Sequence, residues 1–376
     1  MTGEPAARGE RVYVPALDGL RALSIALVVG EHSALEPYPP FRLGYFGVDV
    51  FFVLSGYLIT SLLRGEQRAT GGLVLKKFYA RRFLRIVPAL WAWAAVLLVT
   101  RVDPPASVLW SVLWISNIVL AAGAMPSTGG APVSWSLSIE EQFYALWPPL
   151  GKRLKPAAWA GVAAAVIVAI TVWRAVLVSR GITGFPLLSA RPDAHLDVIL
   201  WGCLAALVEE TGTYARVREF VRARRNTVLL GLAAAAVGTY ALAAVSDRNV
   251  GTFGFTLVAV LTAAFILWLR AAPGAPLTKL LSLAPVVFVG RISYGIYLWH
   301  RPAVYWLYDP ARAPLSSALA GWPGAARDAV LAVWFVGAIL LWSSVSWFVI
   351  ERPFLRLKER FEVLGERRIE AATIAR

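Results

Sequence analysis

An arginine and a histidine stand near the two ends of one apolar stretch, Asp18 to Ser33. Arg21 and His32 are eleven residues apart, about three helical turns, so a helix would place both on one face, roughly 16 Å apart. Ionisable side chains within a membrane-spanning helix are costly and commonly functional. Alternatively, Arg21 and His32 reach the headgroup layers on opposite sides of the membrane and have no role beyond anchoring the helix.

Two further arginines, Arg82 and Arg85, share a helix face at the start of another apolar run. Guanidinium groups bind phosphate bidentately, so with Arg21 they would suit a nucleotide-like cofactor. Headgroup binding and topology signalling are the alternative, which we prefer for the loop residues at 76–81.

Asp49 lies among valines and phenylalanines, where a carboxylate needs a counter-charge or a proton. Its expected depth matches that of His32, and an aspartate that orients a histidine base is a recurring arrangement. We therefore expect Asp49, or else Glu31, to orient His32. A polar residue in the outer interface is the alternative for Asp49.

The segment SWSLSIEEQFY contains two adjacent glutamates. Ser138 and Glu141 have the S-x-x-E spacing of a capping box, which would begin a helix there. Glu140 and Tyr144 are four residues apart on one helical face. Glu140, which has no such structural explanation, is the better candidate for catalysis.

The chain has three histidines and one cysteine. His195 is most simply an interfacial histidine with its hydrogen bonds satisfied. His300, in ISYGIYLWHRP, could line the same outer cavity as His32 and contact substrate. No metal-ligand spacing occurs, and a single cysteine excludes an intramolecular disulfide, so we expect no metal.

Composition indicates the elements that position these residues. Of 376 residues, 58% are hydrophobic and 16% are charged, against about 25% charged in soluble domains. Apolar runs recur along most of the chain, which predicts an all-α, polytopic integral membrane helical bundle. The net charge is +14, and the lysines and arginines that produce it are placed as the positive-inside rule describes for membrane proteins. We therefore expect a lipid bilayer, and no nucleic acid, as partner.

The segment at 106–122 decides the topology, because it is apolar but short and interrupted by polar residues. If it does not cross, there are about ten transmembrane helices, both termini are cytosolic, and the basic loops at 64–85, 152–155 and 216–225 face the cytosol. If it crosses, the later loops invert. The lysine and arginine bias favours ten spans, with 106–122 interfacial or re-entrant.

Six segments carry a resemblance to a known family: the helix with Arg21 and His32, GYFGVDVFFVLSGYLIT, KFYARRFLRIVPAL, SWSLSIEEQFYALWP, ISYGIYLWH and FVIERPF. In this order they resemble the membrane-bound acyltransferase type 3 family over about residues 15–355. The resemblance implies an integral membrane enzyme that moves an acyl group, often acetyl, from cytosolic acyl-CoA to a hydroxyl of a carbohydrate or natural product.

The resemblance also implies roles for single residues. His32 matches the family's catalytic histidine and Arg21 its paired arginine, while Arg82 and Arg85 match the arginine pair that begins the third span. Recurrent polar positions of the family are matched by Asp49, Glu140, Tyr144 and Glu351. His195 departs from the pattern, in which arginine is commoner at that position.

These observations predict an acyltransferase transmembrane domain at 1–355, a charged cytosolic tail at 356–376, and a multi-pass location in the inner (plasma) membrane. Acetyl-CoA or another acyl-CoA would bind Arg21, Arg82 and Arg85. His32 would act as general base, and Tyr144 and His300 would contact a carbohydrate or glycosylated acceptor. A secondary transporter or flippase of a glycan is the alternative, although the two halves show no internal repeat.

Overall fold

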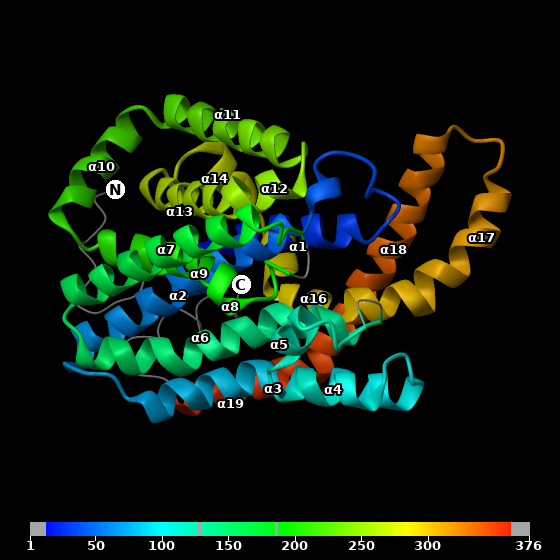
Figure 1. Ribbon diagram of the computed structural model, residues 1–376, viewed down its shortest axis with the longest axis horizontal. Coiled ribbons are helices and arrows are strands. Elements are labelled where there is room, and N and C mark those ends of the chain that lie inside the picture. Colours follow the sequence, from blue (N-terminus) through cyan, green and yellow to red (C-terminus); the bar gives the residue numbers. More distant parts are fainter. Residues whose placement is uncertain (1–12, 127–128, 185–186, 362–376) are drawn as a thin grey trace.

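The computed structural model describes residues 13–126, 129–184 and 187–361, and no strand occurs among them (Figure 1). The predicted all-α class is therefore confirmed for the described part of the chain. Most of the predicted tail at 356–376 lies outside the described residues.

The helices of the first half of the chain are α1 (Pro15–Glu31), α2 (Phe46–Thr70), α3 (Leu75–Thr100), α4 (Pro105–Val112), α5 (Ser116–Ala121), α6 (Ser134–Arg153), α7 (Pro156–Ser179), α8 (Pro192–His195) and α9 (Asp197–Val208). Those of the second half are α10 (Gly212–Ala223), α11 (Arg225–Ala243), α12 (Asp247–Asn249), α13 (Phe255–Ala271), α14 (Pro276–Leu281), α15 (Ala284–Arg291), α16 (Ser293–Ala303), α17 (Asp309–Ala318), α18 (Gly324–Ser346) and α19 (Arg352–Lys358).

Within the described residues, six helical stretches are long and apolar enough to cross a membrane. They comprise α2, α3, α7, α11, the stretch Asp247–Ala271 and the stretch Gly324–Lys358. The multi-pass membrane character is therefore confirmed, while the count of ten spans stays a prediction. One reason for the difference is that α1 has only 17 residues. Another is that the helical region from Ala284 to Ala303 is divided at Ile292 between α15 and α16.

Two local helix boundaries matter for the site. Helix α3 begins at Leu75, so both of its site arginines lie well inside a helix. The predicted capping box is wrong, because α6 begins one turn earlier and the Ser138 hydroxyl donates to the Ser134 carbonyl at 3.1 Å. The 106–122 segment is short and broken as predicted, since α4 and α5 are separated at Leu113–Ile115.

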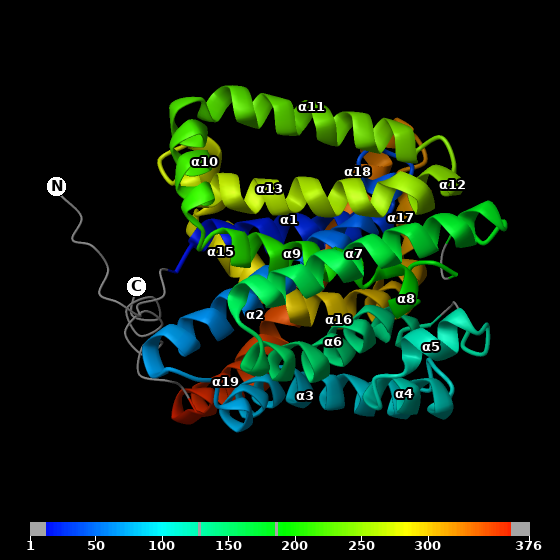
Figure 2. The same ribbon diagram turned by 60° about the vertical axis from the view of Figure 1, so that its left-hand side comes forward.

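Helix α1 runs through the middle of the bundle, between a layer of α11 and α13 and a layer of α3 and α4 (Figure 2). It contacts α2, α13, α14, α15 and α16. Close approach requires glycine at the crossing with α15, because a Cβ at Gly290 would lie 1.9 Å from the Asp18 carbonyl oxygen. Small residues permit such close helix crossings in membranes, and this one holds Arg21 at a fixed depth.

Helix α2 crosses α9 through a second glycine contact. A Cβ at Gly202 would lie 1.9 Å from the Val53 carbonyl oxygen, and one at Gly56 would lie 2.0 Å from that of Ile199. The two backbones therefore touch at the crossing. This contact sets the position of the α2 face that lines the site described below.

This crossing makes a testable prediction about stability. Gly202→Ala places a methyl group where the α2 backbone already lies, so the helices must separate, and overpacking of this kind costs about 1–3 kcal/mol. We expect a lower thermal unfolding temperature in detergent. Gly238→Ala on α11, where no atom lies within 4 Å of the added Cβ, is the matched control. Equal unfolding temperatures for the two variants would contradict the close crossing.

Candidate functional site

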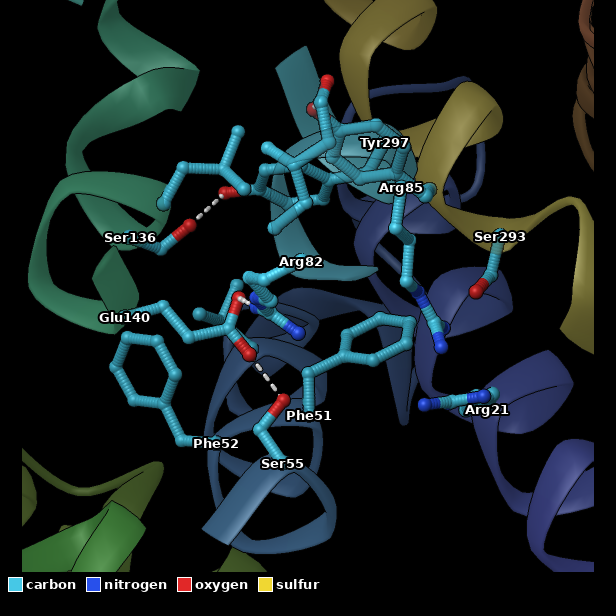
Figure 3. A pocket seen from close by; sticks show the side chains of 14 residues that line it. Arg21, Phe51, Phe52, Ser55, Arg82, Arg85, Ser136, Glu140, Ser293 and Tyr297 are labelled. Atoms are coloured by element: carbon cyan, nitrogen blue, oxygen red, sulfur yellow. Dashed lines mark hydrogen bonds and ion pairs between the residues drawn. The ribbon is translucent and has the colours of Figure 1, made fainter. Parts of the chain in front are cut away.

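A cavity of about 90 Å³ lies within the bundle, where five helices meet (Figure 3). Its wall combines basic side chains from α1 and α3, apolar and hydroxyl side chains from α2, and polar side chains from α6 and α16. The lining residues are Arg21, Val48, Phe51, Phe52, Ser55, Arg82, Arg85, Ile86, Ser136, Leu137, Glu140, Ser293, Tyr294 and Tyr297. Residues far apart in sequence thus form one polar chamber inside an apolar bundle.

The three predicted arginines meet in this cavity, as Figure 3 shows. The Arg21 guanidinium is paired with Asp18 at 3.0 Å. Arg85 is exposed in the cavity and forms no hydrogen bond or ion pair with any residue of the described chain. An unpaired cation in such surroundings favours an anionic ligand. The described residues contain no cluster of three His, Cys, Asp or Glu side chains suited to a metal ion.

Arg82, by contrast, is already neutralised by the protein. Its Nε lies 3.2 Å from Oε1 of Glu141, and its Nη2 lies 3.6 Å from Oε2 of Glu140. Its guanidinium carbon lies 3.6 Å from the centroid of the Tyr144 ring, a cation–π distance. The two arginines of α3, one turn apart, therefore have different electrostatic surroundings.

Glu140 links three helices around Arg82. It accepts a hydrogen bond from the Tyr144 hydroxyl at 2.6 Å, as the four-residue spacing predicts. It also accepts one from Ser55 on α2, a cavity residue that the sequence analysis did not identify. No sequence signal singles out Ser55, because its role depends on how α2 faces α6.

His32 and His300 lie together, outside the set of residues that line the cavity. Their ring centroids are 5.0 Å apart. His32 caps the C-terminus of α1 and its Nδ1 lies 2.9 Å from the Val28 carbonyl oxygen. His300 Nδ1 lies 2.7 Å from the carbonyl oxygen of Tyr297. Because a carbonyl oxygen only accepts, Nδ1 of each neutral ring carries the proton, and Nε2 is left with the lone pair.

Tyr297 connects the cavity to this histidine pair. Its ring lines the cavity, and its hydroxyl bonds Ser136 at 2.6 Å and the Val133 carbonyl at 2.9 Å. His300 follows about one helical turn later on α16. The cavity and the histidine pair therefore occupy neighbouring levels of the same helix.

The prediction that Asp49 orients His32 is wrong. Asp49 Oδ1 lies 2.6 Å from Nε2 of His195, whose Nδ1 lies 2.8 Å from the Ser189 carbonyl oxygen. Both side chains are buried, and the imidazole stacks on Trp135. The backbone carbonyl of Val28, and neither Asp49 nor Glu31, is the hydrogen-bond acceptor of His32 Nδ1. Asp49 and His195 thus pair with each other inside the bundle, while Asp49 Oδ2 has no hydrogen-bond partner among the described residues.

A second buried pair was missed by the sequence analysis. Arg174 on α7 forms a two-point ion pair with Asp197 on α9, at 2.7 and 3.0 Å, and also donates to the Ala194 carbonyl. The sequence did contain a signal for this pair, because Arg174 is the single charged residue within the apolar helix α7. Such a residue needs a counter-charge within the membrane.

A polytopic helical bundle with three arginines around an interior cavity defines a membrane protein with a basic internal site. A family model described as an acyltransferase domain matches residues 14–352, so the chain belongs to this acyltransferase family. It is similar to peptidoglycan O-acetyltransferase OatA of Listeria monocytogenes, with 31% identity over 79% of this chain and 50% of that protein. It is also similar to O-acetyltransferase OatA of Staphylococcus aureus, with 30% identity over 78% of this chain and 51% of that protein.

The chain spans about half the length of these curated relatives. No solved structure matches the chain. Family membership confirms the resemblance drawn from the six sequence segments. The matches give no support to the alternative of a transporter or flippase.

The unequal surroundings of the two α3 arginines make a prediction about stability. Arg82→Ala would leave Glu140 and Glu141 without their cation, and breaking a buried pair in this way costs about 3–5 kcal/mol. Arg85→Ala breaks no ion pair among the described residues. We expect thermal unfolding in detergent to show a large loss of stability for the first variant and little change for the second. The opposite order would contradict the assigned contacts.

Proposed function

We propose that the protein is an integral membrane O-acyltransferase that moves an acetyl group from acyl-CoA to a hydroxyl of a cell-envelope glycan. The observation that supports this most strongly is the cavity cation Arg85, which forms no hydrogen bond or ion pair with any residue of the described chain. Coenzyme A carries phosphates that a guanidinium binds well. In a site of low effective dielectric such a contact is stronger than in water.

The donor would bind with its phosphates on Arg85 and Arg21. Arg21 shares its charge with Asp18, and Arg82 is held by two glutamates, so Arg85 carries most of the attraction in this proposal. Glu140 and Tyr144 would act as positioning residues that fix Arg82 and the cavity wall. This assigns Glu140 a role different from the direct catalysis that the sequence suggested.

His32 would act as the general base. Its Nε2 lone pair would take the proton of the acceptor hydroxyl as that oxygen attacks the thioester carbonyl. The carbon–sulfur bond then breaks, and the sulfur leaves as the thiol of coenzyme A after taking that proton from His32. General-base catalysis supplies about 10²–10⁴-fold in rate. The Val28 carbonyl would hold the ring in the required tautomer, and His300 would contact the acceptor beside it.

The donor and the base would lie at different depths. Eleven residues of helix separate Arg21 from His32, or about 16 Å, and the extended pantetheine arm of the cofactor would bridge them. This fits a topology with ten spans, cytosolic termini in the plasma (inner) membrane, and α4–α5 as a re-entrant segment. Basic residues would then face the cytosolic donor, and His32 the outer acceptor.

The acceptor class is proposed from the relatives. Proteins similar to this chain are named for peptidoglycan O-acetylation, which is the esterification of a glycan hydroxyl. A hydroxyl nucleophile needs a base such as His32, and a carbohydrate supplies many of them. We therefore propose a cell-surface glycan as acceptor.

Replacement of the base tests this function. His32→Ala should lower transfer of radiolabelled acetyl from acetyl-CoA to glycan by at least about 10²-fold in reconstituted vesicles, because the general base is lost. The variant should still bind acetyl-CoA, since His32 does not line the cavity. Transfer near the wild-type rate would contradict the proposed mechanism.

A further inference from the structure

The hydroxyl groups on one side of the cavity have a fixed hydrogen-bond direction. The Tyr297 hydroxyl lies 2.9 Å from the Val133 carbonyl oxygen and 2.6 Å from the Ser136 hydroxyl. A carbonyl oxygen only accepts, so Tyr297 must donate its single hydrogen to Val133. Ser136 therefore donates its own hydrogen to Tyr297. Toward a ligand in the cavity, the Ser136 oxygen can only accept.

Ser55 on α2 has the same property. Its hydroxyl donates to Glu140, whose carboxylate is paired with Arg82 and so cannot donate. The Ser55 oxygen, which also lines the cavity, is then left as an acceptor. Figure 3 shows Arg21 and Arg85 on the other side of the cavity, and their guanidinium groups can only donate. The cavity thus offers hydroxyl acceptors on one side and cationic donors on the other.

This polarity limits the kind of ligand that the cavity suits. The ligand must present an anion to the arginines and N–H or O–H groups to the two serines. Pockets that enclose a whole drug-sized ligand measure about 300–1,000 Å³. The cavity, at about 90 Å³, is well below that size and therefore surrounds a narrow segment of a larger molecule. An anionic cofactor with a thin, amide-containing arm meets all three requirements.

The two serine acceptors lie at different depths in the bundle. Ser136 and Glu140 are four residues apart on α6, or about 6 Å along the helix axis. Ser55 lies at the level of Glu140, because the two side chains are hydrogen-bonded. The pantetheine arm of coenzyme A has two amide nitrogens separated by four covalent bonds, about 5 Å when extended. The spacing of the acceptors therefore matches that of the two N–H groups.

The order of the acceptors leads from the arginines to the histidine pair. Ser55 lies near the arginines, because Glu140 contacts both Ser55 and Arg82. Ser136 lies nearer the histidine pair, because the ring of its partner Tyr297 contacts one of the two imidazoles, at 5.5 Å between centroids. An arm that follows these acceptors would carry a thioester from the arginines toward the histidines.

We propose that Ser55 and Ser136 bind the pantetheine arm of the acyl donor, each by accepting a hydrogen bond from one of its two amide N–H groups. Ser136, the acceptor nearer the histidine pair, takes the amide next to the thioester. This inference rests on the proposed function and adds the residues that set the depth of the thioester. Phosphate contacts alone would leave the arm free to move, whereas these two contacts align the acyl group with His32.

The test removes the N–H group and its acceptor, one at a time and together. The two ligands are acetyl-CoA and an analogue in which the amide nearest the thioester is replaced by an ester. Each is titrated calorimetrically into the purified wild type and into Ser136→Ala. Ser138→Ala is the matched control, because Ser138 is a buried serine of the same helix that does not line the cavity.

We expect the wild type and Ser138→Ala to bind the ester analogue about three- to tenfold more weakly than acetyl-CoA, which is the effect of one neutral hydrogen bond. In Ser136→Ala the analogue should lose this disadvantage, because the acceptor is gone. A merely structural role of Ser136 would weaken both ligands alike and keep their ratio.

Two results would overturn the inference and leave the proposed function standing. One is equal affinity of the wild type for acetyl-CoA and the ester analogue, which decides the question even if Ser136→Ala does not fold. The other is an undiminished difference between the two ligands in Ser136→Ala. Absence of acetyl-CoA binding to the wild type would instead contradict the proposed function, and the inference with it.

Discussion

The cost of holding guanidinium groups inside a membrane bundle governs this structure. Charge in a low-dielectric interior must be compensated by a counter-charge or by a ligand. Arg82 is compensated by Glu140 and Glu141, and Arg21 by Asp18, all within the protein. Arg85 forms no ion pair with any described residue, and the carboxylates of Asp18 and Glu351 act on it from a longer distance. In the proposed function, an anion that enters the cavity would supply the missing close counter-charge.

The remaining buried polar groups fix the frame around that site. Asp49 with His195, and Arg174 with Asp197, tie α2, α7 and α9 to the segment at α8. Since a half-satisfied buried pair is strongly destabilising, these contacts allow few alternative arrangements of the helices. The glycine crossings of α1 and α2 then bring the backbones close enough for the cavity residues to meet.

Helical periodicity was enough to predict the all-α class, the break in the 106–122 segment and the shared face of Arg82 and Arg85. It also predicted the contact between Glu140 and Tyr144, because that contact is local. The pairing of Asp49 was predicted wrongly, since depth along a helix does not specify which neighbour it faces. Ser55 and Tyr297 were missed for the same reason.

The most direct test of the central claim is calorimetry of acetyl-CoA binding to the purified protein at low and high salt, with wild type beside Arg85→Ala. Screening weakens attraction between exposed charges, and the open cavity keeps this contact partly exposed. The account predicts wild-type binding that weakens with salt and is lost in Arg85→Ala. Equal affinity of the two proteins for acetyl-CoA, or no binding to the wild type, would contradict it.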